Sequence, residues 1–292
     1  MINFREEKVM KKSVKILSVL MAIVLMVAAF AACGENTPKV KVVDIALTEE
    51  VYAFGVDPKQ PELLKQVNEI LAEFKNDGTL DAIFNSYFGD GEPKGVKSAK
   101  EDTSKDQFVV ATNAAFPPFE YVEGEYYYGI DMELAEKIAE KLGQELVIKD
   151  MAFESVCLSV GSGKADIAMA GLSKNPEREK QVTFAEPYYS ANQVLIVRGD
   201  DTTFDNCKTM EDVEKILKGL DETVKIGGQK GTTGEAYVNG DDGFGFEGLT
   251  AEFAGYDSAA LAVQDLINGN ISYVIIDKAP AEAIVKSINA MA

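Results

Sequence analysis

The chain has 292 residues, and 29 Lys and Arg against 48 Asp and Glu give it a formal net charge of −19 at pH 7. So acidic a protein is poorly suited to bind nucleic acid or anionic lipid, and any positive charge in a binding site must be local. Histidine is absent, which excludes Ser-His and Cys-His catalysis and most transition-metal sites. The sequence indicates no cofactor, and its length suits two medium-sized lobes better than one core.

Residues 1–32 are predicted to be an export signal. Basic residues precede an apolar run that ends in small residues before Cys33, the pattern of a bacterial lipoprotein signal with Cys33 as the lipidated residue. The alternative is an uncleaved membrane anchor. The signal holds five basic and two acidic residues, so its removal leaves 24 and 46, a net charge of −22. Residues 33–38 are expected to form a polar tether.

The segment after the tether is predicted to hold two strands and two helices. Val40–Ile45 and Val51–Val56 have the apolar content of strands, and helical patterns follow at Pro61–Phe74 and Leu80–Phe88. The run Gly89–Asp106 is rich in Gly, Lys, Asp and Ser and has almost no apolar residue. This composition is typical of a linker.

From Phe108 onward, predicted strands and helices alternate, which is typical of α/β proteins built on parallel sheets. Helices are expected to begin near Asp131, Ser155, Thr209, Ser258 and Ala279, with Thr209 and Asp212 forming a capping box. The predicted strands are Phe108–Thr112, Leu146–Lys149, Asp166–Ala170, Gln193–Val197, Val224–Gly227 and Tyr273–Ile276.

Two further expectations concern side chains. In the helix after Ser258, four apolar residues are expected near one buried face: Leu261, Val263, Leu266 and Ile267. Cys157 is expected to be a buried free thiol, although pairing with Cys207 is the alternative.

The stretch Gly129–Leu142, a turn glycine, an acid able to cap and an amphipathic helix, resembles the signature of family 3 extracellular solute-binding proteins, which bind amino acids for ABC importers. Gln107–Tyr121 resembles the start of these proteins, whereas the earlier segment Lys39–Gly89 resembles their C-terminal tail. The resemblance therefore implies an α/β, two-lobed periplasmic-binding-protein fold (type II) that is circularly permuted, with the usual tail before the usual start.

The resemblance also implies the domain layout. The first strand should lie beside the smaller lobe, and the two early helices should pack on the larger lobe beside Phe108–Thr112. The lobes should be hinged near Tyr188–Asn192 and Asp44–Leu47. The implied divisions are a signal at 1–32, a tether at 33–38, a hinge strand and crossover at 39–50, a larger lobe at 51–188 that contains the linker 89–106, and a smaller lobe at 189–292.

Two segments resemble the parts of the family that hold the ligand's α-carboxylate. In Gly171–Arg178, Arg178 would pair with both carboxylate oxygens, and Ser173 and the backbone at Gly171 would add hydrogen bonds. In Gly227–Gly234 the family's contacts correspond to Gly231, Thr232 and Thr233. This glycine-rich stretch is not a phosphate loop, because a glycine follows Lys230.

The remaining implied contacts are with the ligand's ammonium and side chain. Asp277 matches the residue that receives the α-ammonium, with a helix N-cap as the alternative role. Asn113, Phe116 and Phe153 match the pocket for the side chain. Asn113 stands where an aspartate is frequent, which leaves a preference for cationic side chains open.

The resemblance implies a receptor that captures an amino acid by lobe closure, delivers it to ABC transporter permease subunits and is tied to the membrane through Cys33. A monomer is expected, with a domain-swapped dimer as the alternative. Two other functions stay open: a sensory ligand-binding protein, and an enzyme resembling cyclohexadienyl dehydratase, for which Glu120, Glu154 and Glu186 are the candidate acids.

Overall fold

The structure is a computed structural model that describes residues 38–291. The predicted signal, the lipidation site at Cys33 and the tether through residue 37 lie outside the described residues. No helix in the described range has both the length and the apolar composition that crossing a bilayer requires.

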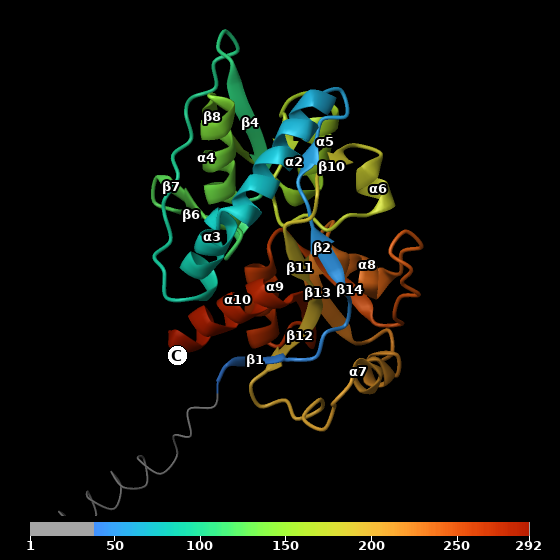
Figure 1. Cartoon of the computed structure of the whole chain (residues 1–292). Coiled ribbons are helices and arrows are strands. Elements are labelled where there is room, and N and C mark those ends of the chain that lie inside the picture. The colour runs from blue at the N-terminus through green and yellow to red at the C-terminus, as the bar shows by residue number, and fades with distance from the viewer. Residues whose placement is uncertain (1–37, 292) are drawn as a thin grey trace, which may run out of the picture. The chain divides into compact units, whose positions relative to one another are not determined.

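One five-stranded sheet, called the β4 sheet here, has the order β10-β3-β9-β4-β8, and Figure 1 labels its strands β4, β8 and β10. Its strand β4 runs parallel to β8 and β9, whereas β3 runs antiparallel to β9 and β10. The strands are β3 (Gly55–Val56), β4 (Gln107–Thr112), β8 (Glu145–Asp150), β9 (Ile167–Ala168) and β10 (Thr183–Phe184).

The second five-stranded sheet, the β12 sheet, has the order β1-β12-β15-β13-β14. Strand β13 is parallel to β14 and β15, and β12 is antiparallel to β1 and β15. The strands are β1 (Val40–Val43), β12 (Gln193–Arg198), β13 (Lys225–Gln229), β14 (Glu252–Tyr256) and β15 (Tyr273–Asp277). The predicted alternation is confirmed, although the edge strand β14 was not foreseen.

A two-stranded ribbon joins β2 (Glu50–Tyr52) to β11 (Tyr189–Ala191), with Tyr52 opposite Tyr189 and Glu50 opposite Ala191. Figure 1 shows this ribbon between the two large sheets. The region predicted as one strand from Val51 to Val56 is therefore split between the ribbon and the β4 sheet. A small three-stranded sheet contains β5 (Ala115–Phe116), β6 (Glu120–Glu123) and β7 (Tyr126–Tyr128).

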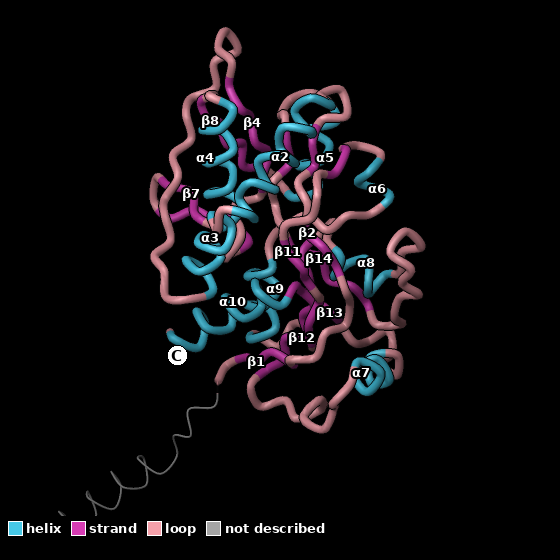
Figure 2. Tube along the Cα trace, in the orientation of Figure 1, coloured by secondary structure: helices cyan, strands magenta, loops and turns pink. Residues whose placement is uncertain are grey.

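Helices pack on both large sheets (Figure 2). Helices α4 and α5 contact strands of the β4 sheet, and α2 and α3 pack against α4, whereas α8, α9 and α10 contact strands of the β12 sheet. The helices are α2 (Pro61–Asn76), α3 (Thr79–Phe88), α4 (Ile130–Leu142), α5 (Phe153–Gly161), α6 (Pro176–Glu179), α7 (Met210–Leu217), α8 (Thr233–Asn239), α9 (Ala259–Ile267) and α10 (Lys278–Ala290).

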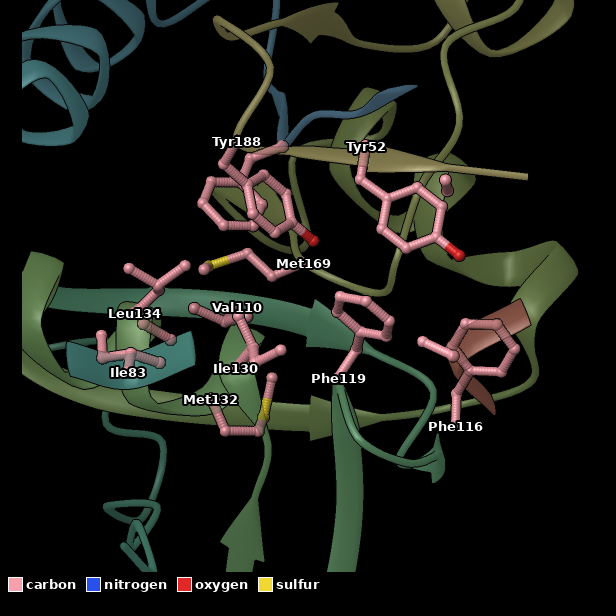
Figure 3. Packing of buried hydrophobic residues seen from close by; sticks show 14 of the residues in the cluster. Tyr52, Ile83, Val110, Phe116, Phe119, Ile130, Met132, Leu134, Met169 and Tyr188 are labelled. Carbon is pink, nitrogen blue, oxygen red and sulfur yellow. The ribbon is translucent and has the colours of Figure 1, made fainter. Parts of the chain in front are cut away.

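The early segment, residues 39–89, is integrated into both sheets, as expected. Strand β1 pairs with β12, and β3 lies inside the β4 sheet. The buried residues of α2 are Val67, Ile70, Leu71 and Phe74, a spacing that places them on one helical face. Figure 3 shows Tyr52 and Ile83 of this segment in the same core as Val110 and Leu134. The segment therefore covers apolar surface that the later elements would otherwise expose.

The linker-like run 89–106 is docked on the protein, contrary to its composition. Val96 is fully buried and pairs with Tyr127 of β7, and Ala99 N–H donates to the carbonyl of Leu146 in β8. The Lys94 N–H donates to the Glu133 carboxylate of α4. The run is held in place because polar groups of β7, β8 and α4 form hydrogen bonds with its backbone N–H and C=O groups.

Other side-chain expectations had mixed outcomes. The capping box of Thr209 and Asp212 is confirmed, and Cys157 is a buried free thiol; Cys207 is also free. Leu261 was wrongly placed on the buried face of α9, because it is 52% exposed while Val263 and Leu266 are buried. Residue 261 lies about 200° around the helix from 263, so both cannot face the core.

Asp131, the acid described from the sequence as able to cap helix α4, does not cap it. No side chain caps this helix. The Asp131 carboxylate is instead fully buried and accepts hydrogen bonds from the Gly171 N–H at 3.0 Å and the Tyr188 hydroxyl at 2.5 Å. It therefore fixes the backbone after β9, next to the predicted ligand segment.

Candidate functional site

The predicted ligand residues gather where the parallel strands end. Asn113 follows β4, Gly171 and Ser173 follow β9, Gly231 follows β13, and Asp277 ends β15. The carboxyl ends of parallel strands are the usual place for ligand sites in α/β proteins. Strand order in both sheets thus brings together segments more than a hundred residues apart.

A small cavity of about 10 Å³ lies among these segments. Such a volume accommodates about one water molecule and no amino acid. Its lining includes most of the predicted ligand residues together with Gln229, which was not foreseen: Phe116, Phe153, Gly171, Ser173, Arg178, Gln229, Thr232, Thr233 and Asp277. The two predicted residues outside this lining, Asn113 and Gly231, each contact a member of it.

Arg178 joins the two sides of the cavity. Its backbone N–H donates to the side chain of Asn175, the N-cap residue of α6. Its guanidinium lies 5.1 Å from the centre of the Phe153 ring. Nη1 donates to the Ser173 carbonyl at 2.6 Å, and Nη2 donates to the Gly231 carbonyl at 3.0 Å. The guanidinium has five N–H donors in a planar fork, so further donors are available to an anion.

The hydroxyls of Ser173 and Thr233 share one unforeseen acceptor. Both donate to the same oxygen of Glu50, Oε2, at 2.5 Å and 2.8 Å. The other oxygen accepts from Thr48 Oγ1 at 2.7 Å and Gln193 Nε2 at 3.1 Å. Glu50 in the β2 ribbon therefore links residues that follow strands of both large sheets.

Asp277 is buried at the cavity, with 7% of its surface exposed. Its Oδ1 accepts from the Tyr52 hydroxyl at 2.6 Å. Burial and the Glu50 charge raise the pKa of Asp277 to about 7, although the hydrogen bonds of Tyr52 and Gln193 act in the opposite direction. Asp277 occupies the N-cap position of α10 but forms no side-chain cap, so capping does not explain this acid.

A hydrogen bond between Gln229 in β13 and Asn113 after β4 joins the two sheets beside the cavity. Gln229 Nε2 donates to Asn113 Oδ1 at 2.8 Å, and Asn113 Nδ2 donates to the Met151 carbonyl at 2.7 Å. Gly231 has φ +74°, and a Cβ there would lie 2.8 Å from Glu154 Cγ. Glycine thus permits the close approach of the two sides at this point.

Two further acids lie close to this region. Glu120 is fully buried, and neither of its carboxylate oxygens has a hydrogen-bond partner among the described residues. Burial, and then the charges of Asp131 and Asp277, raise the pKa of Glu120 well above its usual value. Burial also raises the pKa of Asp131 to about 7. The other candidate enzymatic acids, Glu154 and Glu186, are exposed.

Sequence reasoning missed Glu50, Tyr52, Gln193 and Gln229. No local pattern marks them, because each acts through a partner far away in the chain. In residues 38–291 no three His, Cys, Asp or Glu side chains are grouped as a metal site would require.

Comparison with known proteins shows that the chain is similar to binding proteins. The family described as bacterial extracellular solute-binding proteins, family 3, matches residues 108–266. The arginine-binding extracellular protein ArtP of Bacillus subtilis is 33% identical over 46% of this chain and 49% of its own length. The chain thus spans about half the length of that relative.

Solved structures give a similar result. A mutant of ArgBP from T. maritima shares 35% identity, with a TM-score of 0.51 over 62% of this chain and 72% of its own. The ancestral amino acid-binding protein AncCDT-1, a precursor of cyclohexadienyl dehydratase, shares 28% identity with a TM-score of 0.52 over 62% and 74%. These relatives are binding proteins and not enzymes, although one preceded an enzyme.

Proposed function

This chain belongs to the bacterial extracellular solute-binding proteins of family 3, and on that premise we propose that it captures an amino acid between its two large sheets for an ABC transporter. The observation that carries the proposal is that one guanidinium, Arg178, and one carboxylate, Asp277, line the same cavity. A zwitterionic amino acid offers one opposite charge to each.

We further propose that the ligand's side chain is cationic, as in arginine. Asp277 lines the cavity, Glu50 and Asp131 accept hydrogen bonds from its lining residues Ser173 and Gly171, and Glu120 is coupled by charge to Asp131 and Asp277. Arg178 supplies the positive charge in the lining. Glu120 is a buried carboxyl without a hydrogen-bond partner in the described chain; its raised pKa keeps it protonated, and a cationic ligand side chain beside it would lower that pKa and pair with the carboxylate. The names of ArtP and ArgBP support the same class.

Ligand capture requires the two sheets to separate and close. The cavity is far smaller than an amino acid, and contacts such as Arg178 to Gly231 cross it. We assign the lobes to 51–188 and 189–292 and the hinge to the ribbon of β2 and β11, close to the predicted crossings. A ligand that contacts both lobes stabilises the closed state, which the permease would recognise.

We also propose that the chain is a circular permutation of its family. The family match begins at residue 108, after the docked run 89–106. The T. maritima structure is covered over 72% of its length, so part of it has no counterpart in the aligned region. Residues 39–89 supply β1 to one sheet, β3 to the other and two covering helices. A lipid anchor at Cys33 and a monomeric state belong to the same proposal.

Isothermal titration with the twenty amino acids, ornithine and cystine tests the function. Binding of L-arginine with at least tenfold loss in both Arg178→Ala and Asp277→Ala supports the assignment. Unchanged affinity in both variants would sink it. A second function, a dehydratase, is favoured only by the similarity to AncCDT-1, and conversion of prephenate by the purified protein would establish it.

A further inference from the structure

Among residues 38–291, Glu50 is the one acid that accepts hydrogen bonds from hydroxyls on both sides of the cavity. It lies in β2, opposite Ala191 of β11. Ser173 follows the β4 sheet strand β9, and Thr233 begins α8 after β13. Both side chains are 3% exposed and line the cavity. Their hydroxyls donate to Glu50 Oε2 at 2.5 Å and 2.8 Å.

These hydrogen bonds decide what each hydroxyl can still do. A hydroxyl has one proton and two acceptor lone pairs, and a carboxylate can only accept. When Ser173 and Thr233 give their protons to Glu50, each retains only acceptor capacity toward the cavity. The Asp277 carboxylate, held by Tyr52, lines the same cavity and is also an acceptor.

We propose that Glu50 is a positioning residue that makes the site selective for an amine: it orients the hydroxyls of Ser173 and Thr233 as acceptors, so that with Asp277 they receive an ammonium group. This rests on the proposed binding of an α-amino acid. An ammonium donates three hydrogen bonds and accepts none, and thus matches three acceptors. An α-hydroxyl has a single proton and would satisfy only one of them. This reassigns the Ser173 and Thr233 hydroxyls, which the family resemblance implies for the α-carboxylate, and leaves the carboxylate to Arg178 and backbone N–H groups.

Because of the groups around Glu50, two substitutions of this residue can distinguish the effect of its hydrogen bonds from the effect of its charge. Its Oε1 accepts from Thr48 and Gln193, and the Gln193 Oε1 has no partner in the described chain. In Glu50→Gln the retained oxygen can still accept both hydroxyl protons, and Gln193 can rotate its amide to face the new NH₂ group. The charge is lost, but the acceptor that orients the hydroxyls is kept. Glu50→Ala removes both.

The test compares L-arginine with L-argininic acid, its α-hydroxy analogue, by isothermal titration at pH 8. The measured quantity is the dissociation constant of L-argininic acid divided by that of L-arginine. We expect the wild type to prefer L-arginine, Glu50→Ala to lower the ratio at least tenfold, and Glu50→Gln to keep most of it. Glu49→Ala is the matched control, since it removes an exposed carboxylate one position away and should leave the ratio unchanged.

The outcomes distinguish failure of the proposed function from failure of the inference about Glu50. A wild type that binds neither compound overturns the proposed function and this inference with it. A wild type that binds L-arginine while Glu50→Ala keeps the ratio overturns the inference alone. Equal losses in Glu50→Ala and Glu50→Gln would mean that charge, not hydroxyl orientation, sets selectivity. Tighter L-arginine binding in Glu50→Ala would mean that Glu50 competes with the ligand carboxylate. If Glu50→Ala does not fold, Ser173→Ala must lower the ratio.

Discussion

Asp277→Asn should affect ligand binding and the stability of the ligand-free protein in opposite directions. In the wild type, the Tyr52 hydroxyl donates to Asp277 Oδ1 at 2.6 Å. The substitution keeps an oxygen that can accept this hydrogen bond and removes only the charge. In complexes, truncating one partner of a buried charge pair costs about 2–5 kcal/mol. We therefore expect L-arginine affinity at pH 8 to fall at least tenfold, measured by isothermal titration.

The stability effect follows from the raised pKa. Asp277 has a pKa of about 7 in the folded protein, against an ordinary value of 3.8. Between these values the folded protein holds a proton that the unfolded chain has released, so Asp277 lowers stability as pH rises from about 4 to 7. Asn cannot ionise. Without ligand, the variant should equal or exceed the wild type in melting temperature at pH 8.

Two measurements complete this test. In the wild type, L-arginine affinity should weaken below pH 7, because Asp277 must lose its proton to pair with the ammonium, and binding near pH 7 should release protons into the buffer. Asp131 also has a pKa raised to about 7, so Asp131→Asn serves as the comparison for pH effects outside the ammonium contact. If Asp277→Asn melts lower than the wild type at pH 8 and keeps its affinity, the assignment of Asp277 is refuted.

Further outcomes are expected from other parts of the chain. Arg178→Lys should weaken L-arginine binding at least tenfold in calorimetry, because Lys lacks the planar fork; unchanged affinity would remove Arg178 from the carboxylate contact. Leu71→Ala should lower the free energy of unfolding by about 2–5 kcal/mol, whereas Leu261→Ala, at a site 52% exposed, should change it by at most about 0.5 kcal/mol; equal effects in denaturant titrations would contradict the packing of α2. Cys33→Ser should abolish palmitate labelling, and labelling equal to the wild type would exclude the lipoprotein signal. Light scattering should give a monomer, and a dimer would favour exchange of residues 39–89 between chains.

The sequence by itself determined the elements that depend on short-range patterns. Strand and helix alternation, the apolar face of α2 and the capping box at Thr209 each follow from residues within a few positions of one another. The candidates Arg178 and Asp277 were implied by the family resemblance of the short stretches that contain them, and such stretches can be read from the sequence directly.

Only the tertiary structure decided which groups meet. Tyr52 and Asp277 are 225 positions apart, and the hydroxyls of Ser173 and Thr233 find Glu50 only after two sheets and a ribbon have assembled. Asp131 had the local pattern of a helix cap but lies against Gly171, because a buried carboxylate is stabilised by whichever donors surround it. Hydrogen-bond partners and burial depend on packing between distant segments, and no short-range pattern encodes them.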